Sequence, residues 1–166
     1  MAQFSAGKIT HPEPHEEGDV SRMTASVHYT RPRASGNAWS TSAIWGRNHK
    51  QIPGGIRNLN SYLLETLYPL SRNNLLTARV EVVDKDDLFA DNQVLEDQLS
   101  TRAGSVFRVH AYTMGYTREL GNWSKLATAL GFNATVYSIP TAIQPFYGDR
   151  PWGANVFLRV RLRPQS

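Results

Sequence analysis

The chain has 166 residues, of which 40% are apolar and 19% are charged, and its formal net charge is +4. This length fits one domain over residues 1–166, and no apolar run reaches the roughly 18 residues of a membrane helix, so a helical membrane protein is excluded. The absence of cysteine removes disulfides and thiolate metal ligands. Basic residues are interleaved with Asp and Glu and form no run, so nucleic-acid binding is not expected.

Alternation of apolar and polar residues with a period of two predicts an all-β chain. Eight candidate strands follow in chain order, at residues 3–11, 21–31, 38–48, 59–69, 75–86, 106–119, 126–138 and 154–163. The last of them has Val and Leu on one face and Asn, Phe and three Arg on the other. Because three arginines do not fit an apolar core, this strand has one apolar side and one cationic side.

The connections between these strands differ in length. Short segments rich in Gly, Asn and Ser at 34–37, 71–74 and 120–124 are typical of hairpin turns. Longer connections lie at 12–20, 49–58, 87–105 and 139–153. Consecutive antiparallel strands reverse direction, so we expect all short turns at one end of the sheet and all long loops at the other. With an even strand number, this pattern is typical of an antiparallel up-and-down β-barrel that spans the bacterial outer membrane.

The two faces of the predicted strands support the same interpretation, because a soluble barrel would either bury several charges or leave an apolar belt in water. In a membrane barrel the apolar side faces lipid and the charged side faces the interior. The interior set is Glu65, Arg79, Glu81, Arg108, His110, Arg159 and Arg161. The lipid-facing set is Val80, Val82, Phe132, Val136, Val156, Leu158, Val160 and Leu162.

Aromatic residues give a second indication of a membrane barrel. Trp39 and Trp45 share a face of one strand, as do Tyr62 and Tyr68 on the next. Each pair is six residues apart, about 20 Å along a strand, which suits two interfacial girdles that flank an apolar band. Aromatic packing between strands of any β protein remains the alternative explanation.

Five segments carry a resemblance to a known class of proteins. They are NSYLLE at 60–65, EVVDKDDL at 81–88, YSIP at 137–140, FYGDRP at 146–151 and FLRVR at 157–161. With them, nearly the whole chain resembles the C-terminal portion of uncharacterised bacterial outer-membrane β-barrel proteins. The resemblance implies an outer-membrane location and a longer precursor with a secretion signal, which this chain lacks. It also implies that the chain is a part of a larger barrel. Such barrels commonly end with an aromatic residue, whereas this sequence ends with Ser166.

The function expected from these patterns is porin-like passage or a structural role in the membrane, without a cofactor. Expected partners are outer-membrane lipid, lipopolysaccharide and small polar or anionic solutes; the oligomeric state stays open. A closed eight-stranded barrel would be filled by paired charges, with Arg159 and Arg161 directed toward Glu65 or Glu81, whereas a barrel with more strands would enclose a channel with a cationic bias. The alternatives are a soluble lipocalin-like carrier and an outer-membrane hydrolase.

Catalytic and metal-binding residues are not predicted. His49, beside a long connection, is the candidate base for a hydrolase, but no Ser-His-acid grouping is evident. His11 and His15 stand near two glutamates, and 84–97 is rich in acidic residues, yet both segments read as solvated loops. The segment 141–153 combines aromatic residues with Pro and Gly, which indicates a packed loop over the barrel mouth or at the outer leaflet.

Overall fold

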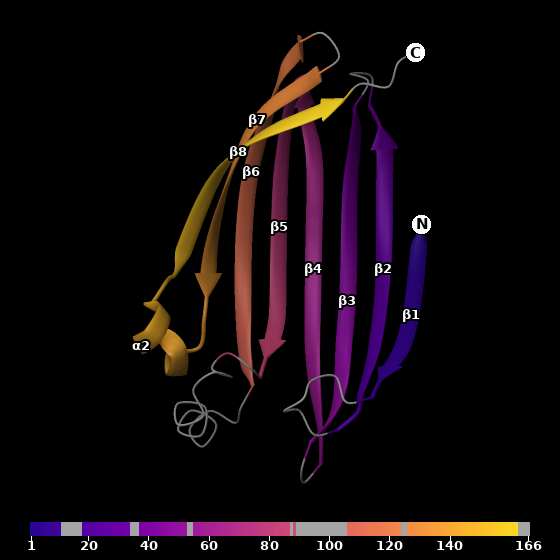
Figure 1. The fold of residues 1–166 in the computed structure, drawn as a ribbon, viewed down its shortest axis with the longest axis vertical. Coiled ribbons are helices and arrows are strands. Elements are labelled where there is room, and N and C mark those ends of the chain that lie inside the picture. The colour runs from indigo at the N-terminus through magenta and orange to yellow at the C-terminus, as the bar shows by residue number, and fades with distance from the viewer. Residues whose placement is uncertain are drawn as a thin grey trace.

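The structure is a computed structural model, and it describes residues 1–10, 18–33, 37–52, 55–86, 88, 106–123 and 126–162. They form one antiparallel sheet whose strands are paired in chain order (Figure 1). The strands are β1 Ala2–Ile9, β2 Val20–Pro32, β3 Ala38–Ile52, β4 Gly55–Ser71, β5 Asn74–Lys85, β6 Phe107–Trp123, β7 Leu126–Ser138 and β8 Trp152–Leu162. The all-β, up-and-down prediction is confirmed.

The connection between β3 and β4 differs from the prediction. The prediction of a long loop over 49–58 is wrong, because β3 continues to Ile52 and β4 begins at Gly55. His49 lies opposite Asn58 and Lys50 opposite Arg57 within the same ladder. These positions are polar on both faces, so they lack the apolar alternation by which strands are recognised.

Strand β6 is also longer than predicted, since it continues through the expected turn at 120–124 to Trp123. Its pairing register with β7 shifts between Glu119 and Gly121, where Gly121 has a φ of 115°. A β-bulge absorbs an extra residue without ending the ladder, and glycine adopts a positive φ readily. The glycine that indicated a turn therefore marks a bulge.

The connections nevertheless separate the two ends of the sheet (Figure 1). The upper end carries the hairpins β2–β3, β4–β5 and β6–β7 and is called the turn end. In the β4–β5 turn, Asn74 Nδ2 donates to Ser71 Oγ at 2.6 Å, and Asn37 Nδ2 from the neighbouring hairpin donates to the Arg72 carbonyl at 2.8 Å. The lower end, called the loop end, carries the β5–β6 and β7–β8 connections. The latter contains two short helical segments, η1 Thr141–Ile143 and α2 Gln144–Tyr147.

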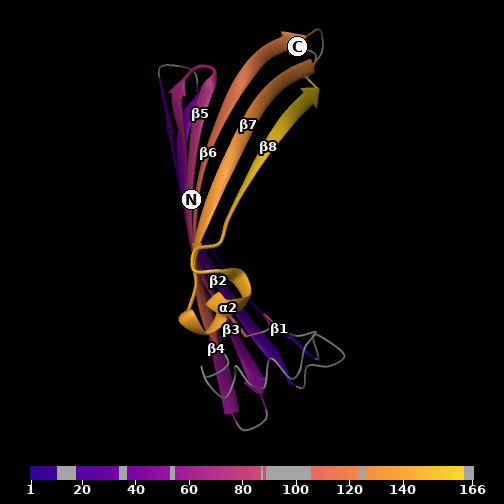
Figure 2. The same cartoon turned by 90° about the vertical axis from the view of Figure 1, so that its left-hand side faces the viewer.

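The sheet is open. Within the described part of the chain, β1 and β8 are its two edges and do not pair with each other. Figure 2 shows the sheet nearly edge-on, twisted and curved, with β6 to β8 bending away from the other strands at the turn end.

A one-layer sheet has little interior. The buried apolar residues among those described are Val20, Phe107, Ala111, Ala129 and Ile143. Of these, Ile143 in η1 is 1% exposed and packs against Phe107 at the loop end of β6. Since no second sheet or long helix covers either face of the described sheet, most large apolar side chains remain exposed.

Candidate functional site

One face of the sheet, called here the apolar face, carries the side chains in phase with Val80. Register places all eight residues predicted to face lipid on this side, in β5, β7 and β8. Their neighbours across the remaining strands are Phe4, Val27, Ala43, Leu64 and Met114. Leu64 is 52% exposed and Val156 is 75% exposed. A continuous apolar surface of this extent has no described protein element packed on it.

The four predicted interfacial aromatics also lie on the apolar face, in two groups. Trp45 lies directly opposite Tyr62 toward the loop end. Toward the turn end, the Trp39 ring makes edge contacts with Tyr29 at 5.7 Å and with Tyr68 at 6.3 Å between centroids. The sheet thus holds aromatic side chains on both sides of its apolar band, which is consistent with the girdle expectation and with cross-strand packing alike.

A polar cluster borders the apolar face beyond the loop-end aromatics. Arg108 Nε donates to Asp84 Oδ1 at 2.7 Å, and the Asn60 backbone N–H donates to Asp84 Oδ2 at 3.0 Å. Arg47 Nε donates to Asn60 Oδ1 at 2.8 Å, while its guanidinium lies 5.5 Å from the Trp45 ring centroid. The apolar face therefore ends in a row of hydrogen-bonded charged groups.

This cluster corrects two predicted interior residues. Arg108 lies opposite Asp84, and His110 lies opposite Val82, so both are on the apolar-face side of the sheet. Grouping them with Arg79 and Glu81 is wrong. The prediction assigns both residues to the interior because they are polar. Beyond the apolar band, however, both faces of a strand carry polar residues, so polarity no longer shows which face a residue is on.

The opposite side, called here the polar face, holds the other five predicted interior residues. Arg79 Nη2 lies 2.6 Å from Glu81 Oε1, and Arg79 Nη1 lies 3.7 Å from Glu65 Oε2. Arg79 therefore lies between two carboxylates, and the structure brings these three residues together on one face of the sheet.

Arg159 and Arg161 do not reach Glu65 or Glu81, and that pairing prediction is wrong. Arg159 Nη2 lies 2.5 Å, and Arg161 Nη2 3.4 Å, from Glu119 Oε1. Glu119 is opposite Ala129 in β7, which is opposite Arg159 in β8. Because the side chain of Ala129 is small, the side chain of Arg159 can extend over it to reach Glu119. Glu119 is missing from the predicted interior set because it lies just before Gly121 and Asn122, which indicated a turn.

The polar face is the more crowded side. Ala111, Thr117 and Ala129 are buried on it. At Gly115 a Cβ would collide with Asn133 and Thr77 from the two neighbouring strands, and at Gly131 it would lie 2.9 Å from ring atoms of Phe157. Side chains of neighbouring strands converge on the concave side of a curved sheet, so this convergence marks the polar face as concave.

His49 and His28 are held by hydrogen bonds to neutral side chains. His49 Nδ1 lies 2.7 Å from Asn58 Oδ1, and His28 lies between Ser42 Oγ and Ser26 Oγ at 2.9 and 3.1 Å. Over the described part of the chain, no three His, Asp or Glu side chains are grouped to hold a metal. His11, His15 and most of the acidic stretch 84–97 lie outside the described residues.

The segment between β7 and β8 folds against the loop end of the polar face. Ile143 is 1% exposed and contacts Phe107, with Leu88, Val109 and Ile139 around them. Beside this cluster lies an apolar cavity of about 220 Å³, and Tyr147 is one of the residues that line it. The loop is therefore packed through Ile143, whereas the aromatic residues on which the prediction rested are exposed: Phe146 and Tyr147 are each 48% exposed, and Trp152 at the end of the loop is 75% exposed on the apolar-face side.

No family model matches the chain, and no curated protein or solved structure matches it. None of the described helices is long and apolar enough to cross a membrane. The resemblance to outer-membrane barrels therefore stays a prediction.

Proposed function

We propose that this chain forms the wall of a bacterial outer-membrane β-barrel, with its apolar face against lipid and its polar face toward the interior. The observation that carries this proposal is the uncovered apolar face. Large side chains such as Leu64, Phe132 and Val156 are about half exposed or more. In water a patch of this kind promotes association, whereas in a bilayer it meets its preferred surroundings.

The borders of the apolar face support a membrane orientation. Aromatic rings prefer the interface, where one part of the ring contacts apolar chains and the other meets water. Beyond Trp45 and Tyr62, the Arg47 and Arg108 cluster would lie at headgroup level, where guanidinium groups can meet the phosphates of lipopolysaccharide. The loop end then corresponds to the outer surface and the turn end to the periplasm.

A bilayer also requires that the two sheet edges be paired. Unpaired backbone N–H and C=O groups are costly in hydrocarbon, and closed barrels avoid them. Since β1 and β8 are the first and eighth strands of an up-and-down sheet, they run in opposite directions and could close as an antiparallel pair. Further strands between them would give a wider barrel.

The strand number decides between the two roles within this proposal. Eight strands enclose a space that side chains fill, so the Arg79 and Arg159 ion pairs would form a plug and the role would be structural. More strands would leave a water-filled channel and a porin-like role. Planar-bilayer recording distinguishes them, because stepwise currents indicate a channel and insertion without current indicates a plug.

The runner-up is a soluble carrier barrel for a small apolar ligand, which needs apolar side chains inside and polar ones outside. The crowding of polar-face side chains over Gly115 and Gly131 argues for the reverse curvature. If the purified chain stays folded and monomeric in plain buffer, the carrier is favoured and the membrane proposal fails.

A cysteine pair on one strand tests the lipid contact directly, because the chain has no cysteine of its own. Leu63 and Leu64 are adjacent in β4 and face opposite sides. A polarity-sensitive fluorophore on Leu64→Cys, refolded into vesicles, should emit as in an apolar medium and be quenched by brominated lipid. On Leu63→Cys, brominated lipid should quench it much less. Equal lipid quenching at the two positions would contradict the proposal.

A further inference from the structure

A hollow of about 360 Å³ opens toward the loop end of the sheet, across β2 to β5. Its floor includes Gly46, where a Cβ would lie 2.7 Å from Ser61 Oγ. The missing side chain at this position keeps the hollow open. The polar-face residues that line it are Arg22, Thr24, Asn48, Leu59, Ser61, Val83 and Lys85.

Strand register explains how these side chains surround the hollow. Arg22 is opposite Asn48, which is opposite Leu59, and this row forms the loop-end side. The next row on the same face is Thr24, Gly46, Ser61 and Val83. Gly46, which has no side chain, forms the floor, and the other three residues form the turn-end side. The hollow therefore lies between two rows of the polar face, with backbone between them, and its size is within the range of small-molecule sites.

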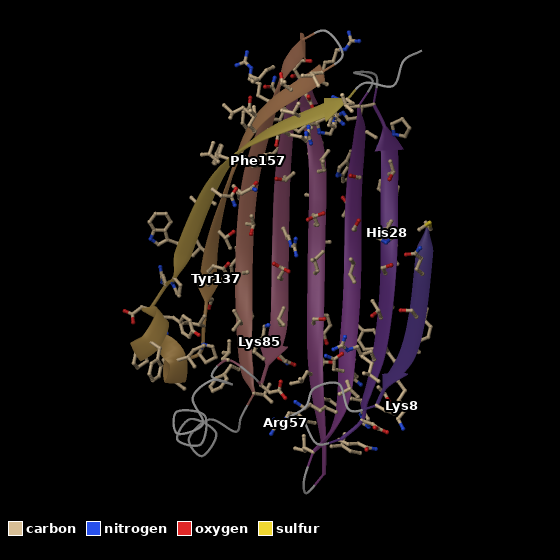
Figure 3. The ribbon with its side chains drawn as sticks, in the orientation of Figure 1. Lys8, His28, Arg57, Lys85, Tyr137 and Phe157 are labelled. Carbon is tan, nitrogen blue, oxygen red and sulfur yellow. The ribbon has the colours of Figure 1, made fainter. Side chains whose placement is uncertain are left out.

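The charge around the hollow is mainly positive. Arg22 and Lys85 are exposed, and within the described residues neither has an ion-pair partner. Asp86, which also lines the hollow, lies 3.5 Å from Lys50 Nζ and 3.3 Å from Arg57 Nη1. Arg57 and Lys85 come from neighbouring strands at the loop end (Figure 3). Arg47 and Asp84 also border the hollow, but their side chains are on the apolar-face side, where Asp84 pairs with Arg108. On the polar face, the two cations that line the hollow without an ion-pair partner among the described residues are therefore Arg22 and Lys85.

We propose that this hollow binds a small oxyanion, a solute that carries a phosphate or carboxylate group. The Arg22 guanidinium and the Lys85 ammonium would supply the charge, and Asn48 and Ser61 would donate hydrogen bonds to the remaining oxygens. Asp86 holds Lys50 and Arg57 in place and prevents a second anion from binding beside the first.

This inference deepens the proposed function, since it depends on the polar face being the interior wall of the barrel. At the loop end, the site would lie at the outer mouth and capture anions before they pass the Arg79 ion pairs. In a plugged barrel the same site would be a terminal binding site. The ligand class does not depend on which of the two forms is correct.

Binding of inorganic phosphate to the full chain, refolded in a non-ionic detergent that contains no phosphate, tests the site. Isothermal titration at low ionic strength should show saturable binding that sulfate displaces and that an equal chloride concentration displaces far less. Arg22→Gln and Lys85→Gln should each weaken the affinity by about tenfold, because each removes a charge-assisted contact. Use of this detergent excludes lipid phosphate as the source of the signal.

Two further variants separate a specific site from general attraction to a basic protein. Gly46→Val keeps every charge but fills the floor, and it should also weaken phosphate binding about tenfold. Arg31→Gln removes one charge at the turn end, outside the hollow, and should leave affinity unchanged. Equal losses for Arg31→Gln and Arg22→Gln, or unchanged binding in Gly46→Val, would overturn the site. Fluorophore quenching at residues 63 and 64 reports lipid contact separately, so failure of the site and failure of the membrane proposal are distinguishable.

Discussion

Replacement of Leu64 by Arg examines the lipid-facing role of the apolar face most directly. Leu64 lies two residues from Tyr62 and four from Tyr68 on the same side of β4, or about 7 and 13 Å along the strand. It is therefore near the middle of the band between the aromatic groups. A lipid-facing arginine near the bilayer midplane costs about 2–4 kcal/mol in free energy of unfolding, which is roughly 30-fold to 1000-fold in the folding equilibrium.

Leu63→Arg is the matched control, since the same charge enters one residue away on the other face. Leu63 is opposite Glu81, so the new guanidinium gains a carboxylate neighbour, and we expect a cost within about 1 kcal/mol. Denaturant titration of both variants in lipid vesicles gives the two free energies. Equal losses, or no loss for Leu64→Arg, would refute the assignment of the apolar face to lipid.

The remaining predictions concern contacts on the polar face and at the mouth. Glu119→Gln should weaken the contact with Arg159 by up to about 1 kcal/mol, since both groups are partly exposed, and hydrogen exchange in β8 should become faster. Gly131→Ala places a methyl group against the Phe157 ring and should lower stability by about 1–3 kcal/mol in denaturant titration. Ile143→Ala leaves a cavity and should loosen the β7–β8 connection by about 2–4 kcal/mol, seen as faster proteolysis within 139–151.

Two of these variants have a control in the same chain. Gly153→Ala adds a methyl group with no atom within 4 Å and should be close to neutral; a loss equal to that of Gly131→Ala would implicate glycine flexibility instead of the Phe157 contact. Thr141→Ala alters an exposed position of η1 and should not change proteolysis. If hydrogen exchange in β8 is unchanged by Glu119→Gln, this ion pair does not hold the edge strand.

Local alternation predicted most of the fold. Eight strands, their order along the chain and the separation of apolar from polar side chains within each strand follow from a period of two, because neighbouring side chains of a strand must point to opposite sides. The same property separated Arg79 and Glu81 from Val80 and Val82. Sequence reasoning failed at 49–58, where polar residues on both faces continue the β3–β4 ladder.

Pairing between strands decided the rest. Alternation fixes the two faces within one strand, but only register shows which face joins which face of the neighbour. The strand register shows that Arg108 and His110 lie on the apolar-face side, contrary to the prediction. It also aligns Glu119, Ala129 and Arg159 on three neighbouring strands, so Arg159 can reach Glu119 across the small Ala129. The hollow over Gly46 depends on four strands meeting side by side. The sequence by itself determined a sheet with one apolar and one charged side, and the tertiary structure decided which charges meet, because those contacts join residues distant in the chain.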